Sequence, residues 1–211
     1  MKTKSIELNE RFDHVYWSFY LYNTSLTELL LLTQSAYSPK ECNIIKGRPF
    51  NFYKVTLQYC FLMEYNKLLE KGGKQKEHNV SSLFHLNKYM LDFIGDKYDE
   101  SYLQNKVDLE TILNTDTYYK FRDLRDSKFA HSDFKSSPFQ VKALNEDEID
   151  EAFEHLNVIR EVIKRCTKQF DFIYDLAIPS RDKRTFNFVS NQSKYKEYYL
   201  NSFGKDKKTK M

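Results

Sequence analysis

Glycine, proline and cysteine are all scarce in this sequence, with 5, 4 and 3 residues respectively in a chain of 211. So few turn-forming residues favour long helices over a sandwich of many short strands. Cys42, Cys60 and Cys166 are odd in number and far apart, which argues against a disulfide framework and for a reducing compartment. The patterns CxxC, HExxH, GxxxxGKS/T and GxGxxG are absent, so zinc ribbons, zincins and nucleotide-binding loops have no support and we expect no cofactor and no metal.

Long apolar runs are also missing. The longest strongly apolar run, Leu29 to Leu32, is far shorter than the roughly 20 residues needed to cross a bilayer. The N-terminal residues MKTKSIELNERF are charged and lack the apolar stretch of a secretory signal. We therefore expect a protein without a membrane segment that stays in the cytoplasm.

Charge is unevenly distributed, although the net charge is only +3. Residues 180–211 hold nine Lys or Arg against three acidic residues, so residues 1–179 are slightly acidic. A basic tail can bind an RNA backbone by releasing counterions, whereas its last eight residues, rich in Gly and Lys, are typical of a solvated, disordered end. We predict a helical domain over 1–179 and a basic tail over 180–211, partly disordered or with a short helix.

Apolar residues recur at helical spacing in most segments, and 16 Tyr and 17 Phe can fill a core from few positions. The fold class predicted is all-α, an up-and-down bundle of about five helices. In the second helix we expect Phe52, Val55, Tyr59, Leu62 and Leu69 to face inward. The last and clearest stripe is Ile149, Phe153, Leu156, Ile159, Ile163, Cys166, Phe170 and Ile173. We expect a first helix from Phe12 to about Tyr37, ended by Pro39, a second from Phe50 to Lys71, and a third from a cap at Ser81 or Ser82 to Ile94. Two further helices are expected, one starting from a cap at Asp116 or Thr117 and one from beyond Asn145 to about Ile178. Residues Glu100 to Leu113 are predicted to form a weaker helix or a long connection, and Phe139 to Leu144 an extended segment.

Charged side chains crowd into one segment, Tyr119 to Phe134, with the sequence YKFRDLRDSKFAHSDF. One interpretation is a solvated helix with ion pairs such as Arg122 with Asp126. However, Arg125 lies one turn beyond Phe121 and continues its inward stripe, and an Arg in such a position is usually paired or in a pocket. This segment is therefore the candidate site.

These residues resemble the HEPN domains, whose signature is an Arg, commonly followed by a polar residue, and a His four to six positions after the Arg. Here the signature is Arg125, Asp126 and His131. The sequence LRDSKFAHSD, which lies late in a helix, is most similar to the abortive-infection and toxin-antitoxin branch of the HEPN domains. The resemblance covers about Phe12 to Ile178 and does not extend to the tail.

The resemblance implies metal-independent RNA cleavage, in which a ribose 2′-hydroxyl attacks its own 3′ phosphate and leaves a cyclic phosphate. His131 would transfer the proton and Arg125 would hold the phosphate oxygens. Asp126 would orient one of them by hydrogen bonding. Among substrate-binding candidates, Ser127 would steady the imidazole or contact RNA, Lys128 would contact RNA, and Arg122 would either extend the positive groove or pair with an Asp.

Helix geometry limits how Arg125 and His131 can cooperate. Residues six apart lie about 240° around and ~9 Å along a straight α-helix, so they cannot both contact one phosphate. Either the helix breaks before His131 or two copies meet, and HEPN proteins form symmetric dimers with both motifs in one cleft. We therefore expect a homodimer with a composite site, restrained by a partner that the resemblance suggests is a nucleotidyltransferase-like antitoxin.

Two other interpretations stay open. The chain can be a non-catalytic HEPN-like module that binds RNA, a nucleotide or a protein, because one fold serves many functions. It can also be a plain helical interaction protein in which the match of Arg125 and His131 is accidental.

Overall fold

A computed structural model of the protein describes residues 2–33, 37–71, 81–126 and 144–168, together with Asn191 and Lys194. Most residues in these ranges belong to helices and none to a β-strand, which confirms the all-α prediction. None of their helices is both long and apolar enough to span a bilayer. In chain order the elements are α1 (Lys2–Thr33), α2 (Pro39–Ile45), α3 (Arg48–Leu68), α4 (Leu83–Ile94), the 3-10 turn η1 (Gly95–Tyr98), α5 (Asp99–Leu113), α6 (Asp116–Leu124) and α7 (Glu146–Thr167).

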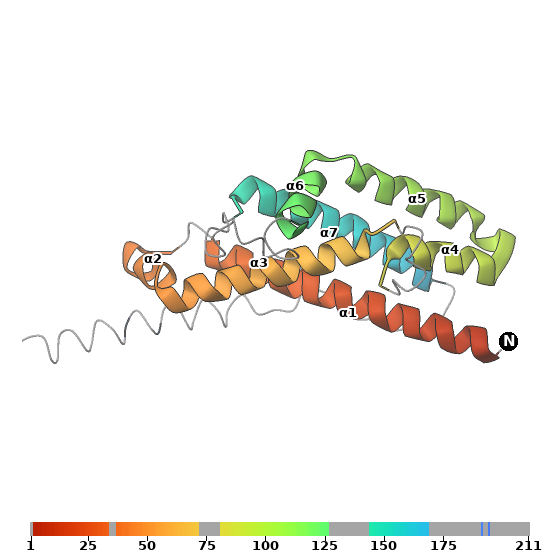
Figure 1. Cartoon of the computed structure of the whole chain (residues 1–211), viewed down its shortest axis with the longest axis horizontal. Helices are drawn as coiled ribbons and strands as arrows, with labels where there is room; N and C mark the ends of the chain where they lie inside the picture. The colour runs from red at the N-terminus through yellow and green to blue at the C-terminus, as the bar shows by residue number, and fades with distance from the viewer. Residues whose placement is uncertain are drawn as a thin grey trace, which may run out of the picture.

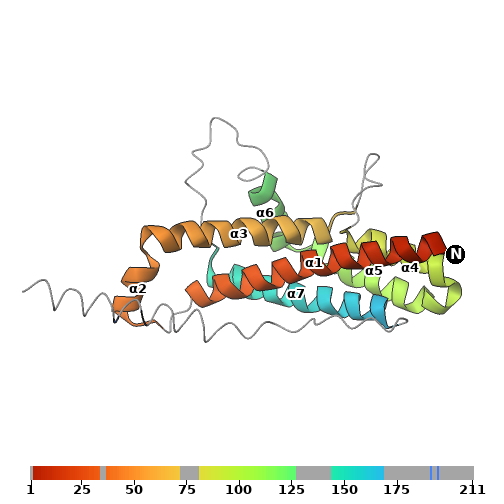
Figure 2. The same ribbon diagram turned by 90° about the horizontal axis from the view of Figure 1, so that it is seen from below.

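Helices α1, α3, α4, α5 and α7 run roughly along one long axis, whereas the short α6 lies across it (Figures 1 and 2). Helix α1 makes its most extensive contacts with α3, and the two run in opposite directions in both views (Figures 1 and 2). Helix α7 contacts α1, α4 and α5, while the short α6 contacts α3, α5 and α7. Helix α6 therefore lies over the junction of three longer helices, which fixes the position of the side chains it carries.

Side-chain caps stand at the starts of α2, α6 and α7. Asn145 and Glu148 form a capping box at the start of α7, in which each side chain bonds the other residue's backbone N–H. At the start of α6 the Thr115 hydroxyl accepts a hydrogen bond from the N–H of Tyr118, so Thr115 is the cap. The predicted caps were Asp116 and Thr117, and the nearer of them, Asp116, lies one residue later. Helix α4 begins after Ser82, whose side chain forms no cap hydrogen bond, and ends at Ile94, before Gly95 with a φ of 75°, so its bounds agree with the prediction.

The first helix and Pro39 differ from the prediction. Helix α1 begins at Lys2, ten residues before the expected Phe12, and ends at Thr33. Pro39 does not end it, and instead begins α2 at the first helical position, where its missing N–H costs nothing. Ser38 and Glu41 form a capping box around it.

The core centres on an aromatic cluster where α1, α3 and α6 meet. Tyr22 stacks on Phe61 with ring centroids 5.4 Å apart, and Phe121 packs edge-on against Phe61 and Tyr65 at 5.1 and 5.4 Å. All four side chains are fully buried. Burial of each contributes about 1.5–3 kcal/mol, so Phe121 is a main anchor of α6.

The buried face of α3 also differs from the prediction. Phe52, Val55 and Tyr59, which were expected to face inward, are exposed, and Phe52 is 76% exposed. Apolar residues occur around much of this helix, so spacing alone does not identify the buried face, and the contact with α1 selects the face of Leu57 and Phe61 instead. Leu62 and Leu69 are buried as predicted.

Helices α5 and α7 follow the sequence pattern more closely. Residues 100–113, predicted as a weaker helix or a connection, belong to the regular helix α5. In α7 each predicted apolar residue from Ile149 to Cys166 is either buried or packed against the core. The remaining predictions concern residues outside the described ranges: Phe170 and Ile173, the extended piece before Leu144, the end near Ile178, and the tail apart from Asn191 and Lys194.

Candidate functional site

One face of α6 carries the candidate residues. Tyr118, Arg122 and Arg125 follow each other at i, i+4 and i+7, which places them in one row along the helix. Phe121 points into the core and holds α6 against α3. On the side of α7, the Thr117 hydroxyl donates to Glu151. The row containing the two arginines is therefore fixed by packing on one side and a hydrogen bond on the other.

This row lines a hollow of about 340 Å³ between α3, α5 and α6. Its opposite walls are Asn66, Glu70 and Lys71 from the end of α3, and Leu113 and Asn114 from the end of α5. Tyr119 lines the hollow beside Tyr118. The described walls thus hold three cationic side chains and one carboxylate. Asp126 and Glu110 beside them neutralise part of the positive charge, and the N–H donors of the three cations can bind an anionic ligand.

Asp126 organises the two guanidinium groups. Arg125 donates from Nε and Nη2 to Asp126 Oδ1 at 2.7 and 2.6 Å, and the Arg125 side chain is only 25% exposed. Arg122 is 53% exposed, and its Nε lies 3.8 Å from Asp126 Oδ2, beyond hydrogen-bond distance. Arg125 is therefore held in place, whereas Arg122 is the more available of the two cations.

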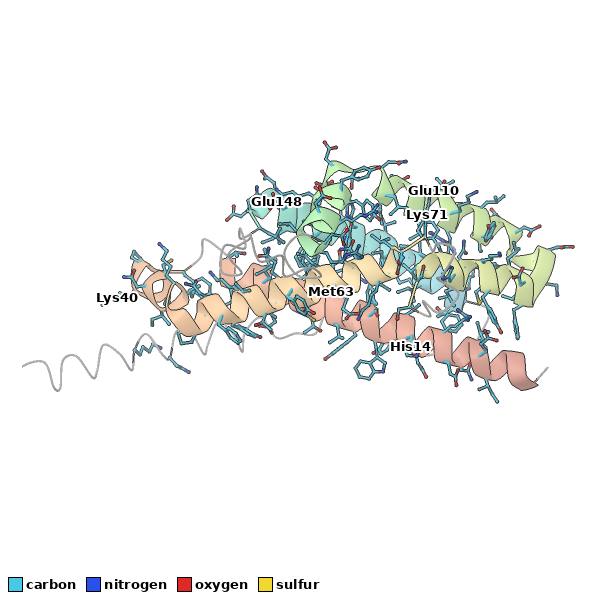
Figure 3. All side chains as sticks on the ribbon, in the orientation of Figure 1. His14, Lys40, Met63, Lys71, Glu110 and Glu148 are labelled. Atoms are coloured by element: carbon cyan, nitrogen blue, oxygen red, sulfur yellow. The ribbon has the colours of Figure 1, made fainter. Side chains whose placement is uncertain are left out.

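Lys71, the third cation that lines the hollow, is held less firmly than Arg125. Lys71 lies 3.2 Å from Glu110 on α5, and both side chains are exposed (Figure 3). Its Nζ also lies 5.5 Å from the centre of the Phe84 ring. An exposed pair of this kind contributes little to stability. Lys71 can therefore turn towards a ligand in the hollow at small cost.

The structure brings together three of the six predicted site residues, Arg122, Arg125 and Asp126. His131, Ser127 and Lys128 lie outside the described residues. Regular α-helix ends at Leu124, and the backbone is π-helical at Arg125 and Asp126. Two of the candidate residues therefore lie on a π turn, and π turns occur frequently at functional sites.

Sequence reasoning missed most of the walls. Tyr118 and Tyr119 had a local signal, because they lie one turn before Arg122 on the same helix. Asn66, Lys71 and Asn114 had none, since they come from the ends of two other helices that meet only in the fold.

A second hollow of about 250 Å³ lies between α5 and α7. It is lined by Asp108, Glu151, Glu154 and His155, among others. Burial lowers the pKa of His155, partly opposed by the nearby Glu151 carboxylate. Within the described ranges, no three His, Cys, Asp or Glu side chains are grouped so as to hold a metal ion. This hollow lacks cationic walls and so does not compete as an anion site.

Comparison with known proteins found no matching family model, no matching curated protein and no matching solved structure. The hollow and its residues are therefore the features from which a function can be proposed.

Proposed function

We propose that the chain is a HEPN-like, up-and-down helical bundle that acts as a metal-independent endoribonuclease of the toxin or phage-defence type. The observation that supports this best is the pair of guanidinium groups, Arg122 and Arg125, on one wall of a polar hollow. Arginine forks bind phosphate oxygens through several N–H donors at once, and RNA presents a phosphate at every nucleotide. A cytoplasmic location belongs to the same proposal.

The proposed reaction uses Arg125, which lines the hollow, and His131, which lies outside the described residues. A ribose 2′-oxygen attacks the adjacent phosphorus, its proton passes to the imidazole of His131, and the bond from phosphorus to the 5′-oxygen breaks. The products are a 2′,3′-cyclic phosphate and a 5′-hydroxyl, which takes up a proton from an acid. Arg125 stabilises the charge that builds on the phosphate oxygens. Asp126 acts as a positioning residue, because it bonds two N–H groups of Arg125.

A homodimer completes the proposal. The hollow is open to one side, and a second copy related by a two-fold axis would bring a second Arg125 and His131 to the same groove. A partner such as a nucleotidyltransferase-like antitoxin would restrain the nuclease in the cell.

The test is cleavage of RNA by purified protein in EDTA. We expect cyclic phosphate ends from the wild type and loss of cleavage in Arg125→Ala and His131→Ala, each with an unchanged unfolding transition. Arg160→Ala is the matched control, because Arg160 lies on α7 beside Asn157 and Phe19 and does not line the hollow. Cleavage that survives both site substitutions rejects the assignment.

The second candidate is a module that binds RNA, a nucleotide or a protein without cleaving RNA. One observation favours it: the described residues that line the hollow offer two guanidinium groups, one ammonium group and two side-chain amides, all of which can bind a ligand. This candidate predicts salt-sensitive RNA affinity, no turnover, and no effect of His131→Ala.

A further inference from the structure

The hollow beside α6 is lined by side chains that can bind more than a phosphate group. We propose that it is a subsite for one unpaired RNA nucleotide, with the base against the ring of Tyr119 and the phosphate on Arg122. This inference rests on the proposed function and specifies its substrate as single-stranded RNA.

Tyr119 supplies the stacking surface. Its side chain lines the hollow and is 52% exposed, although large aromatic rings are usually buried. The Tyr118 ring braces it edge-on, with centroids 5.7 Å apart at an angle of 67°. Tyr118 in turn lies 6.3 Å from the buried Tyr65. An exposed ring that is fixed from behind gives a base a rigid platform and loses little entropy on binding.

Two amides face the same space. Asn66 is almost fully buried, and its Nδ2 donates to the Leu62 carbonyl at 2.7 Å, which fixes the orientation of the side chain. Asn114, at the end of α5, is exposed at the opposite wall. An amide carries both a donor and an acceptor, as the edge of a nucleobase does. The amides thus give the hollow a way to prefer some bases over others.

Size and charge fit one nucleotide. A volume of about 340 Å³ is at the small end of ligand pockets, which typically measure ~300–1,000 Å³. Arg122 is the exposed cation and is only loosely paired with Asp126, so it can take the phosphate without breaking a hydrogen bond. In a duplex the bases are stacked and paired, and none can reach the ring of Tyr119. The hollow therefore selects unpaired RNA.

Binding is measured with the wild-type full chain in EDTA and a labelled 12-nucleotide RNA whose 2′-O-methyl groups block cleavage. We expect the single strand to bind more tightly than the same strand in a duplex. Tyr119→Leu should weaken single-strand binding roughly 5- to 150-fold, as for loss of one stacked base, while Tyr119→Phe keeps wild-type affinity. Tyr53→Leu is the control, because Tyr53 is similarly exposed but lies on α3 away from the hollow.

Equal affinity for single strand and duplex, or an unchanged affinity in Tyr119→Leu, overturns the subsite. Its failure is distinguishable from that of the nuclease. RNA cleavage that is lost in Arg125→Ala but unaffected by Tyr119→Leu rejects the subsite alone. Tyr119-dependent binding by a protein that never cleaves RNA rejects the nuclease and retains the subsite.

Discussion

The hydroxyl of Tyr65 on α3 and Nδ1 of His155 on α7 share a hydrogen bond of 2.9 Å, and their rings stack with centroids 5.9 Å apart. His155 Nε2 lies 3.9 Å from Glu151, whose carboxylate also accepts from Thr117 on α6. One imidazole thus links the core of α3 to the helix that carries the candidate site.

The stability of the protein should therefore depend on the protonation of His155. Burial lowers its pKa from the ordinary value of 6.5, so the unfolded chain binds this proton first as the pH falls. The free energy of unfolding is then unaffected well above pH 6.5 and decreases as the pH falls from 6.5 through the lower folded-state pKa. The slope from this one group is at most about 1.4 kcal/mol per pH unit.

Urea unfolding between pH 7.5 and 5 measures this slope. His155→Gln keeps a polar side chain near Tyr65 but does not titrate, so its stability should decrease less steeply than that of the wild type. His14→Gln, on the exposed face of α1 (Figure 3), should retain the wild-type slope. A wild-type slope in His155→Gln would contradict the argument.

A buried amide network joins α4, η1 and α5. Asn87 Oδ1 accepts from the Tyr98 hydroxyl and from Asn105 Nδ2, both at 2.9 Å, and Asn87 Nδ2 donates to the Tyr102 carbonyl at 3.0 Å. Asn87→Leu keeps the branching and the number of side-chain heavy atoms but leaves these groups with fewer partners. We expect a loss of about 2–4 kcal/mol in the free energy of unfolding.

Asn157→Leu provides the comparison for Asn87→Leu, because Asn157 is an exposed asparagine of α7 whose Oδ1 accepts only at the surface, from Arg160. It should change stability by no more than about 0.5 kcal/mol. Similar losses in the two variants, measured by chemical denaturation, would show that burial of the Asn87 amide is not what matters.

The three cysteines should differ in reactivity. Burial raises the pKa of the Cys166 thiol to about 12, and its sulfur lies 3.1 Å from the Tyr98 hydroxyl. Cys42 and Cys60 are only partly buried. Because the thiolate is the reactive form, a thiol reagent at pH 8 should modify Cys166 only after unfolding. Mass spectrometry of native and denatured protein can locate the modified residues, and rapid native labelling of Cys166 would refute this.

The parts of the fold that were predictable are those where a single helix face carries the apolar residues. In α7 the run from Ile149 to Cys166 has acidic and basic residues on its other side, so only one orientation buries it well. In α3 large apolar residues occur on two faces, and only the tertiary contact with α1 decides between Phe52 and Phe61. The start of α2 had a local signal that was missed, the Ser38 and Glu41 spacing around Pro39.

Part of the candidate site was also predictable from the sequence, and part was not. That Arg125 is both paired and in a hollow was predictable, because it continues the row of Tyr118 along one helix. The opposite walls were not, because the contacts that bring Asn66 and Asn114 together depend on how α3 and α5 end against each other. Local periodicity contains no information on which helix ends meet.

Asp126 provides the sharpest test of the site, because it should affect binding and cleavage in opposite directions. Its carboxylate neutralises part of the charge of both Arg122 and Arg125. Asp126→Asn removes that charge, so RNA affinity at low salt should rise and the plot of log K against log salt should steepen by about 1. Cleavage should nevertheless fall roughly 10- to 100-fold, because Arg125 loses the partner that orients it.

Asp123→Asn makes the same change in net charge on the same helix. Asp123 is exposed and, within the described part of the chain, forms no ion pair with either arginine. We expect it to shift the salt dependence by less than half as much and to leave cleavage unchanged, because long-range attraction between exposed charges is screened. If both variants changed affinity and cleavage equally, the effect of Asp126 would be one of overall charge, and the hydrogen bonds to Arg125 would have no role in orienting the guanidinium.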